Sequence, residues 1–156
     1  MRKATLLLAL FGLIGSLWAA DPMMGTFKLN LAKSKIPAGM ATAKESLMTF
    51  RELDANTIEA TSKDTRNDGS VVTAKWTTPK NGGIQTYQQG GPEKGTSIFA
   101  VVVDSNIAYN VFMQNGKQVF LLRVNMSKDG KTFTSTTKGT DAQGKPYEGL
   151  WFFEKQ

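Results

Sequence analysis

The chain has 156 residues, which is about the length of one domain. It contains no histidine and no cysteine, which excludes Ser-His-Asp and Cys-His nucleophilic catalysis, disulfides, and metal sites built on imidazole or thiolate. We therefore expect no cofactor and no bound metal. The formal net charge is +6 and falls to +4 if Arg2 and Lys3 leave with a leader segment, so the domain itself is only mildly basic.

Residues 1–20 have the organisation of a secretory signal peptide. Arg2 and Lys3 precede the apolar run Ala4–Ile14, and the segment ends in Ala19 and Ala20. This run is shorter than the roughly 20 apolar residues that span a bilayer, and no basic flank follows it. We expect cleavage after Ala19 or Ala20. Residues 21–156 would then form a single domain, periplasmic or secreted, that is not inserted in a membrane.

Turn-forming residues recur about every eight to twelve positions, a spacing typical of an all-β meander. Several form Asn-Gly or Asp-Gly pairs, such as Asn115-Gly116 and Asp129-Gly130, which accept the positive φ angles that two-residue hairpins require. The segments between the turns are β-branched or alternate apolar and polar residues. They predict ten strands: Thr26–Leu31, Ser46–Leu53, Thr57–Lys63, Val71–Thr77, Ile84–Tyr87, Ser97–Val103, Ile107–Gln114, Gln118–Met126, Thr132–Lys138 and Tyr147–Glu154.

The fold class predicted from these strands is all-β, an antiparallel up-and-down meander of 8 to 10 strands closed into a barrel. Closure into a barrel removes exposed sheet edges. A sandwich of two separate sheets is the alternative. A barrel that spans the outer membrane is excluded, because Thr132–Lys138 offers lipid no apolar face and the chain ends in Glu154-Lys155-Gln156 without an aromatic anchor.

Both ends of the predicted domain carry motifs of a known group. The opening Met24–Lys35 (MGTFKLNLAKSK), together with Lys128–Thr134 (KDGKTFT) and Gly139–Gly144 (GTDAQG), resembles small secreted lipocalin-like bacterial proteins, most of them uncharacterised. Gly25-Thr26-Phe27 departs from the Gly-x-Trp of lipocalins proper by a phenylalanine in place of the tryptophan. The resemblance implies a calycin-type, lipocalin-like β-barrel and an apolar ligand. It implies no catalytic residue.

Alternation along the strands predicts which side chains point into the barrel. The soft and aromatic residues on the inner faces suit an adaptable apolar pocket, although side chains of this size can also fill a small barrel. Arg51, Lys75 and Arg123 fall on the outer face, so a neutral or weakly polar ligand fits better than a carboxylate. The candidate lumen residues are Met48, Phe50, Ile58, Trp76, Tyr109, Val111, Met113, Phe120 and Leu122.

Ala32–Lys44 is the longest predicted connection, and it carries Ile36 and Met40 among polar neighbours. Loops of this length are usually functional or disordered, so we expect Ile36 and Met40 to act as a lid or plug over one mouth. A solvated linker is the alternative. Ile98–Val103 and Leu150–Phe153 are apolar on both faces, which indicates either cover by the chain's own segments or a contact between copies. We expect a monomer or a weak dimer.

Three classes of function remain open from the sequence. The first is a barrel that binds a small apolar ligand. The second is an envelope surface-interaction module, with a filled barrel and no ligand, that uses lysines such as Lys28, Lys33, Lys35 and Lys44. The third, an enzyme, is disfavoured because aspartates such as Asp54 lie where turn chemistry explains them. Nucleic acid is not an expected partner, because no cluster of basic and aromatic residues is present.

Overall fold

The computed structural model describes residues 22–37, 43–140 and 145–156. The predicted signal peptide, its cleavage sites and Met40 lie outside these residues. In the described ranges, no helix is long and apolar enough to cross a membrane.

Eleven antiparallel strands and one short 3-10 turn make up the described chain. The first four strands are β1 (Gly25–Leu29), β2 (Glu45–Asp54), β3 (Thr57–Thr65) and β4 (Val71–Pro79), with the turn η1 (Leu31–Lys33) between β1 and β2. They are followed by β5 (Gly83–Ile84), β6 (Thr86–Gln89), β7 (Thr96–Val102), β8 (Ile107–Gln114), β9 (Lys117–Met126), β10 (Thr132–Thr140) and β11 (Pro146–Lys155).

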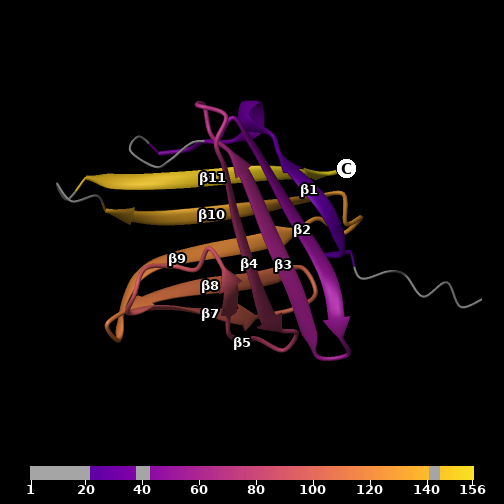
Figure 1. The fold of residues 1–156 in the computed structure, drawn as a ribbon, viewed down its shortest axis with the longest axis vertical. Helices are drawn as coiled ribbons and strands as arrows, with labels where there is room; N and C mark the ends of the chain where they lie inside the picture. The colour runs from indigo at the N-terminus through magenta and orange to yellow at the C-terminus, as the bar shows by residue number, and fades with distance from the viewer. Residues whose placement is uncertain (1–21, 38–42, 141–144) are drawn as a thin grey trace, which may run out of the picture.

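All eleven strands belong to one sheet, in the order β5-β7-β8-β9-β10-β11-β1-β2-β3-β4-β6. Figure 1 shows β2, β3 and β4 crossing in front of the group β7 to β11, so the sheet folds over on itself into two layers. Pairing of β1 with β11 joins the layers on one side. The result is a nearly closed antiparallel barrel, and the sandwich of two separate sheets is wrong because the hydrogen-bonded ladder is continuous.

A single segment draws together the two remaining edges of the sheet. β5 pairs with β7 at one edge, and β6 pairs with β4 at the other. Between them, the backbone N–H of Gln85 donates to the carbonyl oxygen of Ile98 at 2.8 Å. The prediction of 8 to 10 strands is therefore wrong: the predicted strand Ile84–Tyr87 is two short strands, because the chain passes from one sheet edge to the other at Gln85.

Local turn chemistry sets many strand ends. The carboxylate of Asp54 accepts a hydrogen bond from the backbone N–H of Asn56 at 2.8 Å, and the carboxylate of Asp68 accepts one from that of Ser70 at 2.8 Å. Hydrogen bonds from these same two partners hold the pKa of both aspartates below its ordinary value. Asn115 adopts a φ of 49°, which asparagine tolerates in a tight hairpin.

One cluster of large side chains forms the packed core of the barrel. Phe27 on β1 is fully buried, and its ring meets that of Phe133 edge to face, with centroids 5.1 Å apart. Phe133 in turn stacks on Phe153 at 4.4 Å. The buried members of this cluster, called the packed cluster below, are Phe27, Leu29, Met126, Phe133 and Phe153.

Candidate ligand cavity

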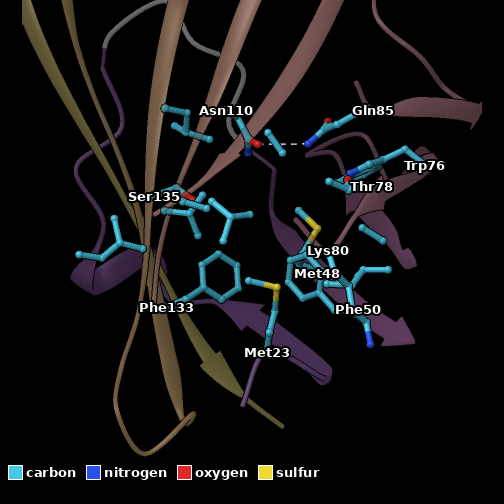
Figure 2. Close-up of a pocket in the computed structure, with 18 of the residues that line it drawn as sticks. Met23, Met48, Phe50, Trp76, Thr78, Lys80, Gln85, Asn110, Phe133 and Ser135 are labelled. Atoms are coloured by element: carbon cyan, nitrogen blue, oxygen red, sulfur yellow. Dashed lines mark hydrogen bonds between the residues drawn. The ribbon is translucent and has the colours of Figure 1, made fainter. Parts of the chain in front are cut away.

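A cavity of about 570 Å³ lies between the two layers of the barrel. This volume is in the usual range for small-molecule sites. Side chains from β2, β3, β4 and β6 line one wall, and side chains from β7 to β11 line the other (Figure 2). Six of the nine predicted lumen residues line it, namely Met48, Phe50, Ile58, Trp76, Phe120 and Leu122.

The other three predicted lumen residues, Tyr109, Val111 and Met113, do not line the cavity, and the face assigned to β8 was wrong. The lining residues of β8 include Ala108, Asn110 and Phe112. These lie opposite Val124, Leu122 and Phe120 of β9, which also line the cavity.

The physical reason for this reversal is a β-bulge. Next to the turn of the β8–β9 hairpin, Gln114 lies opposite Lys117 and Met113 lies opposite Gln118. The next pair is Phe112 opposite Phe120, so Val119 is an extra residue. A one-residue shift exchanges the two faces of a strand. Without the bulge, Val111 would lie opposite Phe120 and would face the cavity, as predicted.

The loops that line the cavity gather at one end of the barrel. They include Pro22 and Met23 before β1, the end of β4 at Thr78–Lys80, and the turn Asp104–Asn106 between β7 and β8. Figure 2 shows the Met23 side chain close to Phe133 and Phe50. This end of the cavity is called the loop end below. The β1–β2 connection, which carries Ile36, joins the strands at the opposite end.

Ile36 packs against the packed cluster but is not among the residues that line the cavity. The neighbouring residue Lys35 exchanges backbone hydrogen bonds of 2.7 and 2.8 Å with Leu150 of β11. Met40 lies outside the described residues. The lid role of Ile36 and Met40 therefore remains a prediction, and the position of Ile36 favours a plug at the far end over a gate at the loop end.

Charge is almost absent from the cavity wall. Of the described residues that line it, only Lys80 and Asp104 are charged, both at the loop end. The ammonium group of Lys80 pairs with the carboxylate of Glu52, whose side chain is 54% exposed. Asp104 accepts hydrogen bonds from two backbone N–H groups of its own turn. No arginine of the described chain lines the cavity.

Basic side chains of β2 and β4 lie on the outer surface instead, in an ion-pair cluster. Arg51 and Lys75 both pair with Glu59, and the Lys75 Nζ to Glu59 Oε2 distance is 2.9 Å. Although exposed itself, Arg51 covers the Glu59 side chain, which is only 8% exposed. Hydrogen bonds from Arg51 and then Lys75 lower the pKa of Glu59 from 4.5 to about 2.

Three polar side chains on the cavity wall are linked by hydrogen bonds. Gln85 Nε2 donates to Asn110 Oδ1 at 3.1 Å, and the hydroxyl of Tyr87 lies 3.3 Å from Gln85 Oε1. The Tyr87 ring stacks on Trp76 with centroids 5.4 Å apart, and burial raises the pKa of its phenol. Gln85 and Asn110 were not predicted as site residues. In the sequence, only Asn110 could have been recognised as a candidate site residue, because it is a polar residue within an apolar strand.

Comparison with known proteins bears on the fold alone. No protein-family model matches the chain, and no curated protein matches it. Among solved structures, the crystal structure of a mutant of the fluorescent protein UnaG aligns with a TM-score of 0.59 and 11% sequence identity. The alignment covers 87% of this chain and 97% of that chain. The chain therefore folds as a calycin-like barrel.

Proposed function

We propose that this protein is an exported, non-enzymatic barrel that binds a small neutral or weakly polar apolar ligand in its cavity. The observation that carries the proposal is a cavity of about 570 Å³ whose lining is mostly apolar. Its two charged side chains lie at the loop end, and its uncharged polar residues besides Gln85, Tyr87 and Asn110 are Thr78, Ser105, Asn106 and Ser135. A calycin-like barrel is compatible with this role, since such a fold can enclose a ligand between its layers.

The chemistry of the wall supports a neutral ligand. A fatty-acid carboxylate buried in this cavity would need a charged partner, because an unpaired buried charge is costly. Arg51 and Lys75 are committed to Glu59 on the outer surface. Lys80 lines the cavity at its loop end, and its ammonium group is paired with the carboxylate of Glu52.

The interaction-module alternative loses two of its supports. The cavity contradicts a barrel filled by side chains. In addition, two of its lysines are paired, Lys28 with Glu45 at 3.1 Å and Lys33 with Glu154 at 2.7 Å. The carboxylates of Asp54 and Asp68 accept hydrogen bonds from backbone N–H groups within their own β-turns. This structural role supports a non-enzymatic function.

Ligand binding can be tested with two fluorescent probes of opposite character. N-phenyl-1-naphthylamine is neutral, and cis-parinaric acid is a fatty carboxylate. We expect saturable binding of the neutral probe and weaker binding of the acid at neutral pH. Ala108→Phe, which places a ring in the cavity, should weaken binding, whereas Ala55→Phe in an exposed turn should leave it unchanged. Equal binding by a folded Ala108→Phe variant and the unaltered protein would contradict the proposal.

Export is tested separately, by cell fractionation and N-terminal analysis. We expect a soluble mature chain that begins at Ala20 or Asp21. Recovery of the intact chain from Met1 in the membrane fraction would overturn this part of the proposal. Native mass spectrometry of protein purified from its own envelope should then reveal a bound small molecule and whether the chain is a monomer or a weak dimer.

A further inference from the structure

The strongest feature that the proposed function leaves unexplained is the polar group on the cavity wall. Its position is set by the segment that draws the barrel shut. Gln85 lies between β5 and β6, and its backbone is held to Ile98 at 2.8 Å. Its side chain reaches Asn110 on β8, as the dashed line in Figure 2 shows. Two carboxamides therefore meet inside an apolar cavity.

The hydrogen bonds of this group fix the direction of the Asn110 carboxamide. Asn110 Oδ1 accepts a hydrogen bond from Gln85 Nε2 at 3.1 Å, so the oxygen arm of the Asn110 carboxamide is the one that faces Gln85. The amino group on the other arm makes no hydrogen bond within the described chain. The hydroxyl of Tyr87 lies 3.3 Å from Gln85 Oε1 and can hold the Gln85 amide in turn. A carboxamide has two N–H donors on its nitrogen, and a donor that faces an apolar cavity favours a ligand that accepts from it.

Flat aromatic surfaces lie on the Gln85 side of this polar group, where the Tyr87 hydroxyl is 3.3 Å from Gln85 Oε1. Trp76 and Tyr87 stack with an interplanar angle of 23°, and both line the cavity. On the β8–β9 wall, the Phe112 and Phe120 rings meet edge to face at 5.2 Å. Planar conjugated molecules gain from contact with such rings beyond the burial of their area.

We propose that Asn110 is a specificity-determining residue, whose Nδ2 amino group donates a hydrogen bond to the carbonyl oxygen of a neutral aromatic ligand that lies against Trp76 and Tyr87. Gln85 is the positioning residue that orients the Asn110 carboxamide. This inference rests on the proposed function, because it names the class of ligand that the same cavity takes.

The test uses two probes of the same shape, 2-acetylnaphthalene and 2-ethylnaphthalene, which differ by a carbonyl group. Their affinities are measured by displacement of N-phenyl-1-naphthylamine from the full chain. Asn110→Leu should weaken binding of the ketone about threefold to tenfold more than binding of the hydrocarbon, which is the contribution of one hydrogen bond. Asn125→Leu, the same exchange at an exposed site outside the cavity, should leave both affinities unchanged.

The outcomes separate the two proposals. If Asn110→Leu changes both affinities by the same factor, the Asn110 inference is wrong and the cavity proposal stands. Failure of both naphthalenes to displace the bound dye would also overturn the inference alone. If the dye itself does not bind the unaltered protein, the proposed function fails and the inference falls with it. Asn110→Ala, which is smaller, must give the same difference between probes, and this variant decides the question if Asn110→Leu does not fold.

Discussion

The two sides of the barrel interior share the same alternation of inward and outward residues, but one side is a packed core and the other side encloses a cavity. On the side of β1, β10 and β11, three phenylalanine rings interlock, and Phe27 is 0% exposed. On the side of β3, β7 and β8, the inward positions include three alanines, Ala60, Ala100 and Ala108, and the space beyond them is the cavity. Side-chain volume, and not strand pattern, therefore decides which part of the barrel is a core and which part is a site.

Truncation of the packed cluster should give the largest effect. Phe27→Ala removes a fully buried ring that contacts Phe50 and Phe133, and it leaves a void that these neighbours cannot close. We expect a loss of about 3–5 kcal/mol in the free energy of unfolding, measured by denaturant titration. If Phe27→Ala lowered the free energy of unfolding less than a Phe→Ala substitution in the cavity wall does, the division between a packed side and a cavity side would be contradicted.

That second substitution is Phe112→Ala. Phe112 meets Phe120 at 5.2 Å but already faces the cavity, so its removal enlarges an existing space and creates no new void. We expect a loss of about 2 kcal/mol, close to the transfer free energy of the ring alone. The affinity for N-phenyl-1-naphthylamine should change more in Phe112→Ala than in Phe27→Ala, because Phe27 does not line the cavity.

Ile36 tests the far end of the barrel. Because Ile36 packs against the packed cluster and does not line the cavity, Ile36→Ser should cost about 1–2 kcal/mol of stability. The dissociation rate of the bound dye, measured by stopped flow, should not change. Met23→Ser at the loop end should raise that rate, because Met23 lines the cavity. Faster dissociation from Ile36→Ser alone would instead support the predicted lid.

Much of this division could be predicted from the sequence, and the failures have a common cause. The bounds of β8 were predicted as they are, Ile107–Gln114, because turn residues flank an apolar run. The face of β8 was not, because Val119 looks like any other strand residue, and only its pairing makes it a bulge. The division at Gln85 likewise depends on the closure of the barrel. Gln85 lies between β4 and β7 in the sequence, but these strands stand near opposite edges of the sheet order, and only the path of the whole meander brings the two edges together.

The outer ion-pair cluster gives a pH test that is independent of the cavity. The pKa of Glu59 is lowered from 4.5 to about 2 in the folded state, so its contribution to stability is present above about pH 4.5 and is lost as the pH falls toward 2. Glu59→Gln should therefore flatten the fall in stability across this window, measured as midpoint denaturant concentration. Ser62→Ala, on the same strand and outside this cluster, is the control and should keep the acid dependence of the unaltered chain.

The smallest expected effect checks the register on which the cavity wall depends. Arg123 lies on β9 next to Leu122, opposite Tyr109 and Thr136 on the neighbouring strands, and is exposed. It makes no ion pair with any described residue, and exposed sites of this kind usually change stability by no more than about 0.5 kcal/mol. Arg123→Ala should therefore leave both the denaturation midpoint and dye affinity unchanged. Leu122→Ala, one residue away, should weaken dye binding because Leu122 lines the cavity. Loss of dye binding in Arg123→Ala, with none in Leu122→Ala, would mean that β9 presents its other face to the cavity.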